Sequence, residues 1–550
     1  MMRLHTDWTY LEQEFGCSIR DHFLMAVRSL DNPKAVTPFL LVRNGRRFGL
    51  FLHVEKGNVE AARLPPDIAP IYYRPYFTFE PGEAAAVHRT LPDAVEHAAG
   101  AERNIAIDAA APMAVAAELK ERFSVSLEDA PLTGTVTVRQ IACSQVAGRL
   151  RKGRPEACKA AARLLERSPA KAGLLPFLSE QQDLRFPALD AAIANAGLAG
   201  VLASSTLNVQ EIAGVPVGEK HRPLAAFYAP GERHAWLMYA GVAAGGRQFA
   251  SPQAALEHIA PGGPLGVEAE DVSAGLARAL GLEERGWRPA DRELRRWRDE
   301  NALPDLPYYI IASRTTRHAI ESALGFAASA LERSAPATEM DAYARYLAAM
   351  REFARAALPG ARAARTLTNF HSGSRTIFPA NAAAHRLDAS INTLKIDAGC
   401  LLFDAEGLLL GCSDIARTVC LSEPARELYA LFEKNIRRSL IPSMRAGRAG
   451  EELHSDATRA VWSQRAKLAG NPLFVDLKAP EAEYDRDVGH LLGKNNLAHL
   501  RLVHGERTSL REGMIACCEY QWPLRGHAIA YEDTCLVTAA GGLNITSDEE

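Results

Sequence analysis

Short apolar runs separated by turn residues dominate the first half of the chain, and their order occurs twice. In the first copy, residues 38–54 predict two strands joined by an Asn-Gly turn, and a buried strand at residues 104–108 precedes an amphipathic helix at residues 112–123. In the second copy, residues 223–239 predict strand, Pro-Gly turn and strand, and residues 264–282 predict a strand followed by a helix. The repeated order indicates two α/β domains of the same type.

From about residue 314 the pattern changes to long Ala-rich helices followed by strands. Residues 317–334 and 337–358 each have helical periodicity, and the second helix is ended by Pro359 and Gly360. Strands follow, then two helices, and then strands to the end. Because helices and antiparallel strands are segregated rather than alternating, this part is typical of an α+β domain.

The length of the chain also requires several domains. A chain of 550 residues is too long for one compact core. We expect the two α/β domains at residues 1–175 and 176–313 and the α+β domain at residues 314–550. A hydrophobic fraction of 47% and a charged fraction of 23% are ordinary for a soluble globular protein.

The charge distribution and the cysteines narrow the classes of function. The 63 basic and 66 acidic residues are spread along the chain, so a nucleic-acid partner is not expected. No apolar run has the length of a membrane span, and the first residues lack the apolar segment of a signal peptide, which together favour a cytoplasmic protein without a membrane partner. The nine cysteines lack the paired spacings of a zinc site or a disulfide framework, so we expect them to be reduced.

An aspartate inside an apolar stretch points to chemistry. Residues 393–420 contain two apolar strands that flank a turn at residues 404–407, with Asp397 near the start of the first strand and Asp414 near the end of the second. Folding of this hairpin brings the two carboxylates together. Two ionised carboxylates in apolar surroundings repel each other and lose hydration unless a cation or a shared proton lies between them. A metal pair is the simplest solution.

Three further residues complete a plausible set of ligands. His490 follows a glycine among apolar residues, and Glu519 and Glu532 each lie within an apolar strand. With the two aspartates they make an oxygen-rich set that contains one imidazole. Such a set suits two ions of Mn²⁺, Co²⁺, Fe²⁺ or Zn²⁺ bridged by water.

These residues occur in the order typical of a known family. From about residue 337 to the end, the sequence resembles the catalytic domain of metallopeptidase family M24, which has the pita-bread fold and includes aminopeptidase P, prolidase, creatinase and ectoine hydrolase. The D-x-G motif of the family matches residues 397–399, and its S-D-x-T-R-T motif matches residues 413–418 with Ala416 in place of the first threonine. Its G-H-x-x-G motif matches residues 489–493, and its two glutamates match Glu519 and Glu532.

The resemblance implies a role for each matched residue. Five residues would be metal ligands: Asp397, Asp414, His490, Glu519 and Glu532. Glu519 would also transfer the proton of the attacking water, and His385 and His499 would be catalytic residues that bind the substrate carbonyl or the developing oxyanion. Arg417 would support a ligand carboxylate from outside the metal site.

The resemblance extends upstream of the catalytic domain. Residues 200–214 are similar to a stretch of the N-terminal domain of creatinase-type proteins, and the first α/β unit looks like a more diverged copy of that domain. Two such domains before a pita-bread domain resemble the three-domain aminopeptidases P. The resemblance also implies a homodimer.

The sequence departs from the family pattern around the substrate. Glu519 is followed by Tyr520 and Gln521 instead of Pro-Gly, and Ala530 stands where many prolidase-like members carry an arginine that binds the substrate carboxylate. Arg525 is our candidate for its replacement as a substrate-binding residue.

Two matches leave alternatives open. The second histidine of the family is matched by His499 with a displacement of two residues, and His504 is the fallback. Glu532 is followed by Asp533, and only one of them can face the metals because neighbours on a strand point to opposite faces. The family match favours Glu532.

The expected function is therefore a dinuclear metal hydrolase that cleaves a C–N bond of a small peptide or amide. An Xaa-Pro aminopeptidase or dipeptidase is the first hypothesis. The alternative is a non-peptidase hydrolase of a small amide, amidine or cyclic metabolite on the same fold. A second alternative is a catalytically inactive binding protein, because a fold alone does not determine a function.

Overall fold

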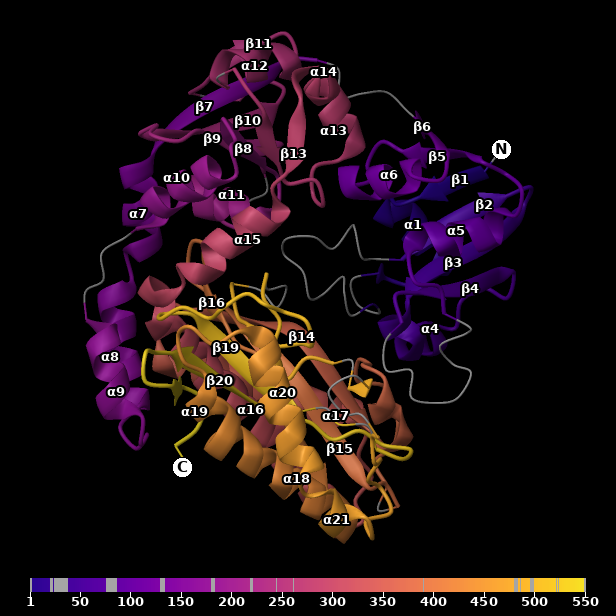
Figure 1. Ribbon diagram of the computed structural model, residues 1–550, viewed down its shortest axis with the longest axis vertical. Helices are drawn as coiled ribbons and strands as arrows, with labels where there is room; N and C mark the ends of the chain where they lie inside the picture. Colours follow the sequence, from indigo (N-terminus) through magenta and orange to yellow (C-terminus); the bar gives the residue numbers. More distant parts are fainter. Residues whose placement is uncertain are drawn as a thin grey trace. The chain divides into compact units, whose positions relative to one another are not determined.

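The computed structural model describes residues 2–19, 23, 38–75, 87–128, 134–179, 184–217, 221–243, 245–260, 262–388, 390–478, 483–484, 486–494, 499–520, 522 and 524–548. The chain forms two compact units, one from Met1–Arg151 with Leu184–Trp297 and one from Lys152–Asp183 with Arg298–Glu550 (Figure 1). The three expected domain boundaries remain predictions. Among the described residues, no helix combines the length and the apolar character needed to cross a membrane.

The first sheet of unit 1 has the order β4-β3-β2-β1-β5-β6. Its strands are β1 (Met2–His5), β2 (Phe39–Arg43), β3 (Arg46–Leu52), β4 (Ile68–Tyr73), β5 (Asn104–Asp108) and β6 (Ser124–Glu128). Its helices are α1 (Trp8–Phe15), α4 (Lys56–Ala62), α5 (Leu91–Ala99) and α6 (Met113–Lys120), with a 3₁₀ turn at His53–Glu55. The predicted Asn-Gly turn between β2 and β3 is confirmed, since Asn44 and Gly45 both have positive φ.

The second sheet of unit 1 has the order β11-β7-β10-β9-β8-β12-β13. Its strands are β7 (Val136–Ala142), β8 (Gly200–Ala203), β9 (Ala225–Tyr228), β10 (His234–Ala240), β11 (Arg247–Phe249), β12 (Leu265–Val267) and β13 (Trp287–Pro289). The helices of this region are α7 (Cys143–Arg151), α10 (Arg185–Asn195), α11 (Thr206–Ala213), α12 (Pro252–Ile259), α13 (Ala274–Ala279), α14 (Leu282–Arg285) and α15 (Asp291–Glu300).

The two sheets of unit 1 repeat one topology. The order β3-β2-β1-β5-β6 in the first sheet corresponds to β10-β9-β8-β12-β13 in the second. In both, the middle strand is antiparallel to the strand that follows it and parallel to the next strand on its other side. This repetition confirms the predicted repeat of element order.

Unit 2 is built from two antiparallel sheets and their covering helices. One sheet contains β14 (Arg362–Ser372), β15 (Thr393–Phe403), β16 (Leu409–Cys412) and β17 (Ile415–Cys420), and β15 pairs with each of the other three. The other has the order β18 (Gly489–Leu491), β19 (Ile515–Tyr520), β20 (Tyr531–Val537) and β21 (Gly542–Asn544). Strand β17 of the first sheet contacts β20 of the second, and this contact joins the two sheets.

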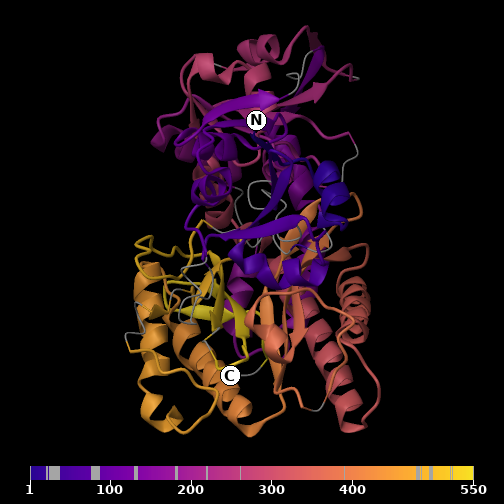
Figure 2. The same ribbon diagram turned by 90° about the vertical axis from the view of Figure 1, so that its right-hand side faces the viewer.

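Unit 2 also contains helices, some of which pack on these sheets. The helices are α8 (Arg154–Leu164), α9 (Lys171–Leu178), α16 (Leu306–Glu332), α17 (Glu339–Ala357), α18 (Glu423–Asn435), α19 (Ile441–Ser443), α20 (Gly450–Trp462) and α21 (Arg465–Leu468), with a π-helical turn at Ile436–Leu440 and 3₁₀ turns at Leu303–Asp305 and Gly373–Ile377. Helix α16 contacts β15 and α17 contacts β14, while α18 contacts β17 and β20. Figure 2 shows the strands of this unit between the helices. The segregated helices and strands confirm the expected α+β class.

A close backbone approach explains the glycine of the D-x-G motif. The strand that we expected to contain Asp414 is interrupted, and Ser413 and Asp414 lie in the break between β16 and β17. At this break, the Ser413 N–H donates to the Cys400 carbonyl at 3.1 Å, and the Ser413 hydroxyl accepts from the Cys400 N–H at 3.1 Å. A Cβ atom on Gly399 would lie 1.8 Å from the Ser413 carbonyl oxygen. Only glycine therefore allows the break that presents Asp414.

We predict that Gly399→Ala destabilises the protein by about 3 kcal/mol, because the backbone at Ser413 has to move to accept the methyl group. The matched control is Gly325→Ala, at an exposed position of α16 where an added Cβ meets no atom within 4 Å. The control should stabilise the protein by about 0.5–1 kcal/mol, since alanine is the better helix former. Denaturant unfolding measures both, and equal stability of the two variants would contradict the account.

Candidate metal centre

The first sheet of unit 2 carries two of the predicted ligands on one face. Asp397 on β15 is paired in register with Asn369 on β14 and Ala416 on β17. The Asn369 amide donates to the Asp397 carboxylate at 2.9 Å, which holds the orientation of that carboxylate. Asp414, in the break before β17, is buried, and one of its carboxylate oxygens lies within 4.8 Å of one from Asp397.

The second sheet brings Glu532 to these aspartates. A carboxylate oxygen of Glu532 and one from each of Asp397 and Asp414 all lie within 4.8 Å of one another. All three residues are buried. The structure therefore brings together, from two sheets, three of the five predicted ligands.

His490 forms a second group with Glu532. Ligand atoms of His490, Cys517 and Glu532 lie within 4.8 Å of one another, and the His490 Nε2 atom is 3.7 Å from the Asp414 carboxylate. The His490 Nδ1 atom is 2.8 Å from the Leu491 carbonyl. Because a carbonyl can only accept, this contact places the proton on Nδ1 and leaves Nε2 with a lone pair that can bind a metal.

Glu519 lies directly opposite Glu532 in the β19–β20 pair. Residues directly opposite each other in an antiparallel pair share a face, so both carboxylates point to the same side of the sheet. Among the described residues, neither three-residue group includes Glu519. It is nevertheless close enough for its charge to raise the pKa of Glu532.

The electrostatics of the group require protons or cations among the carboxylates. Burial, followed by the charges of Asp414, Glu519 and Asp397, raises the pKa of Glu532 well above its usual range. Four carboxylates cannot all be ionised in such a place without compensation. Oxygen-rich sets with one imidazole are typical of sites for divalent transition metals, so the donor set fits two such ions.

Cys517 is a member of this cluster that we did not single out in the sequence. Its thiol contacts the Asp414 carbonyl at 3.7 Å and the Thr534 hydroxyl at 3.8 Å, and burial raises its pKa well above the usual value. Cys517 is therefore a buried neighbour of His490 and Glu532 in the second group of ligand atoms. The sequence signal for Cys517 was its position two residues before Glu519 on the same strand, because such residues point to the same face.

The two alternatives Glu532 and Asp533 lie on opposite faces of β20. Asp533 lies on the face of β20 opposite to Glu532 and accepts hydrogen bonds from Arg417 at 2.5 Å and from Asn544 at 2.9 Å, while Arg437 lies 3.6 Å away. The Arg417 guanidinium holds the pKa of Asp533 below its usual value despite burial. Glu532 faces the aspartates.

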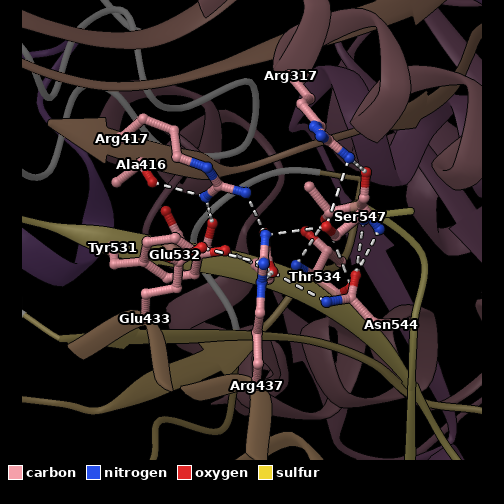
Figure 3. Close-up of polar contacts among 12 residues, drawn as sticks. Arg317, Ala416, Arg417, Glu433, Arg437, Tyr531, Glu532, Thr534, Asn544 and Ser547 are labelled. Atoms are coloured by element: carbon pink, nitrogen blue, oxygen red, sulfur yellow. Dashed lines mark hydrogen bonds and ion pairs between the residues drawn. The ribbon is translucent and has the colours of Figure 1, made fainter. Parts of the chain in front are cut away.

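Arg417 supports the strand of Glu532 rather than a ligand carboxylate. Its guanidinium donates to the backbone carbonyl of Glu532 and to the Asp533 carboxylate, and it lies over the Tyr531 ring at 4.2 Å (Figure 3). Our expectation of direct support for a ligand side chain is corrected accordingly. Arg417 holds the backbone of Glu532.

The roles of His385, His499 and Arg525 in substrate binding stay predictions, and the three residues have different surroundings. His385 is exposed, and its backbone carbonyl accepts from the Glu339 N–H. His499 is buried, with Nδ1 2.9 Å from Asp299 and Nε2 3.7 Å from Glu300, because these carboxylates attract the imidazole. Arg525 is exposed. Among the described residues, neither three-residue group of ligand atoms includes His385 or His499.

Lys395 is the second residue of the site that sequence reasoning missed. It lies two residues before Asp397 on β15 and is 2% exposed. Burial lowers the pKa of Lys395 to about 8. The charge of Arg486 also lowers this pKa, whereas the charges of Asp397 and Glu519 raise it. The alternation of β15 places Lys395 on the face of Asp397.

The sequence of this unit matches a known family. Residues 312–539, less than half of the chain, match the model of metallopeptidase family M24. This match confirms the resemblance for that region. No curated protein matches the chain by sequence.

Three solved structures have a similar fold. The X-prolyl aminopeptidase of Caenorhabditis elegans, described as a cytosolic enzyme with a di-nuclear active site, is 11% identical, and the similarity covers 94% of this chain and 82% of that chain with a TM-score of 0.55. The prolidase of Thermococcus sibiricus is 15% identical, with a TM-score of 0.51 over 68% of this chain and 99% of that chain. The prolidase of Pyrococcus horikoshii OT3 is 19% identical, with a TM-score of 0.50 over 67% of this chain and 99% of that chain. At these identities the likeness establishes the fold.

The family match and the donor set together define the class. Residues 312–539 form a metal-dependent hydrolase domain of the M24 type. The two sheets of unit 1, with their helices, precede it in the chain. M24 metallopeptidases use two divalent metal ions, and the buried carboxylates and imidazole of this domain fit that cofactor.

Two neighbouring substitutions should separate metal binding from folding. We predict that Glu532→Gln leaves the stability of the metal-free protein unchanged or raises it, because the substitution removes a repelling carboxylate. Its affinity for Mn²⁺ should fall about 100-fold or more. Asp533→Asn should instead destabilise the protein by about 3 kcal/mol, because Arg417 is left in a buried place without its carboxylate.

Calorimetric titration with Mn²⁺ and denaturant unfolding of the metal-free protein measure the two effects. The placement of Glu532 would be contradicted if Asp533→Asn lost its affinity for Mn²⁺ and kept its stability.

Proposed function

We propose that this protein is a dinuclear metal hydrolase that cleaves the bond between an N-terminal residue and proline in small peptides. The observation that carries the proposal is the cluster of Asp397, Asp414 and Glu532, whose carboxylate oxygens lie within 4.8 Å of one another inside an M24 domain. The similar folds of an X-prolyl aminopeptidase and of prolidases support proline as the second residue of the substrate.

Five residues are the proposed ligands of the two ions. Asp397, Asp414 and Glu532 supply buried carboxylates from two sheets, His490 supplies Nε2, and Glu519 supplies a carboxylate opposite Glu532. Asn369 orients Asp397, and the Leu491 carbonyl orients His490, so that both ligands are held before any ion arrives. When bound, the pair of ions supplies activated water and polarises the scissile carbonyl.

Glu519 is the proposed general base and acid. Its carboxylate accepts the proton of the attacking water and then delivers it to the leaving nitrogen. The burial of Glu519 excludes competing water from this transfer. The expected roles of His385, His499 and Arg525 in substrate binding stay predictions. The side chains of His385 and Arg525 are exposed, and His499 Nδ1 lies 2.9 Å from the Asp299 carboxylate.

The proposal also covers the oligomeric state of the enzyme, its location in the cell and its metal. We propose a homodimer in the cytoplasm that acts on small peptides, with Mn²⁺ as the first metal to test. The cytosolic X-prolyl aminopeptidase with a similar fold supports this setting.

We predict that gently purified protein contains about two equivalents of a divalent transition metal per chain. The double variant Asp397→Asn with Asp414→Asn should lose this metal and the hydrolysis of Xaa-Pro peptides, because two of the buried ligands are neutralised. A matched control replaces two exposed carboxylates of unit 2, Glu332→Gln with Glu352→Gln, and should keep both properties. Elemental analysis and a peptide assay measure the outcome.

The outcomes also distinguish the alternatives. Bound metal without turnover of any Xaa-Pro peptide, but with hydrolysis of a small amide, would favour a non-peptidase hydrolase. Protein that holds no metal and gains none from added Mn²⁺, Co²⁺ or Zn²⁺ would contradict a hydrolase and leave a binding protein.

A further inference from the structure

The second sheet of unit 1 borders a large cavity that the proposed function does not use. The cavity has a volume of about 830 Å³ and is lined by residues of β7, β10, α7, the end of α11 and the segments next to these elements. Helix α11 contacts both α7 and β10, which places these elements around one space. Cavities that hold small molecules typically have volumes of about 300–1,000 Å³. Among the described residues that line this cavity, none is a proposed metal ligand.

The floor of the cavity is largely apolar. Leu237 on β10 lies opposite Arg139 on β7, and Tyr239 follows two residues later on β10. Because opposite residues share a face and strand side chains alternate, all three side chains lie on the same side of the sheet. Ile141 on β7 adds to this side, and Val215 after α11 adds to the wall. A ligand in the cavity would therefore meet aliphatic side chains and one aromatic ring.

The charged side chains of the cavity are all basic. Arg139 comes from β7, Arg149 from α7 and Arg222 from the segment before β9, and His221 lies beside Arg222. The Arg149 Nη1 atom donates to the Gly214 carbonyl at 2.9 Å, which holds this guanidinium at the wall. Among the described residues that line the cavity, none is an aspartate or a glutamate. Three elements thus bring three positive charges to one space.

Two of these arginines lack an ion-pair partner. In the described part of the chain, Arg139 and Arg222 make no ion pair within 4.0 Å. The Arg139 guanidinium lies 5.9 Å from the centroid of the Tyr239 ring. The charges of Asp271 and Glu268 act on Arg222 only from beyond ion-pair distance. The cavity therefore has positive charge that an anionic ligand can neutralise.

A phosphate group fits this charge better than a carboxylate does. A phosphate monoester carries a charge of about −1.5 to −2 near pH 7 and has three acceptor oxygens. A carboxylate has a single negative charge and would leave two of the three arginines uncompensated. The planar fork of an arginine binds two phosphate oxygens at once. The apolar floor suits a non-polar or aromatic group attached to the phosphate.

We propose that this cavity binds a phosphorylated small molecule. Its phosphate groups contact Arg139, Arg149 and Arg222, and its aromatic or apolar body lies on Leu237 and Tyr239. This site belongs to unit 1 and shares no residue with the proposed metal centre, so the inference does not depend on the proposed hydrolase function.

The test measures binding to the full-length protein after removal of metal, so that phosphate has no ion to bind. Calorimetric titrations with ADP, adenosine and pyrophosphate separate the two parts of the ligand. Adenosine should bind at least about 100-fold more weakly than ADP, because it lacks the groups that pair with the arginines. Pyrophosphate should bind about tenfold more weakly than ADP, because it lacks the aromatic group.

A pair of double variants with the same change in net charge assigns the site. Arg139→Gln with Arg222→Gln should weaken ADP binding about 100-fold or more. The matched control, Arg233→Gln with Arg288→Gln, removes two exposed arginines of the same unit that lie outside the cavity lining, and should change the affinity less than about threefold. All four arginines are exposed, so denaturant unfolding should show unchanged stability in both variants.

Each alternative result would overturn the inference in a defined way. Absence of ADP binding up to about 1 mM would exclude the site as proposed. Equal ADP affinities of the two double variants would place any binding elsewhere, and equal affinities for ADP and adenosine would exclude the role of the arginines. Equal affinities for ADP and pyrophosphate would exclude the role of the apolar floor. A protein that cleaves no peptide but binds ADP in this pattern would contradict the proposed function alone.

Discussion

The repulsion among buried carboxylates is the constraint on which the rest of the second unit depends. Asp397, Asp414 and Glu532 place their oxygens within 4.8 Å of one another, away from water and with Glu519 close by. Such a group raises the free energy of the folded metal-free protein unless its charge is neutralised by protons or cations. The surrounding fold therefore holds these carboxylates in place as a metal site. Metal binding is expected to stabilise the folded state.

The fold meets this constraint through a close backbone approach in one sheet and an ion pair on the far face of the other. Gly399 lets the chain break at Ser413, which turns Asp414 toward Asp397. On β20, the opposite face carries Asp533, and its ion pair with Arg417 fixes the backbone that presents Glu532. Opposing charges on one face of the strand thus hold like charges together on the other.

The sequence predicted the parts of the structure that depend on local pattern. The Asn44-Gly45 hairpin, the repeated element order of unit 1 and the meeting of Asp397 with Asp414 all follow from turn chemistry and periodicity. The placements of His499 and Arg525 could not be predicted, because they depend on partners distant in the sequence, such as Asp299 for His499. Lys395 was missed although strand alternation puts it beside Asp397, because a lysine is normally taken as exposed.

X-ray diffraction from crystals grown with Mn²⁺, recorded at the manganese absorption edge, tests the central claim most directly. The account predicts two anomalous peaks among Asp397, Asp414, His490, Glu519 and Glu532. A structure with manganese bound elsewhere, or with these side chains hydrogen-bonded to one another and no peak between them, would contradict it.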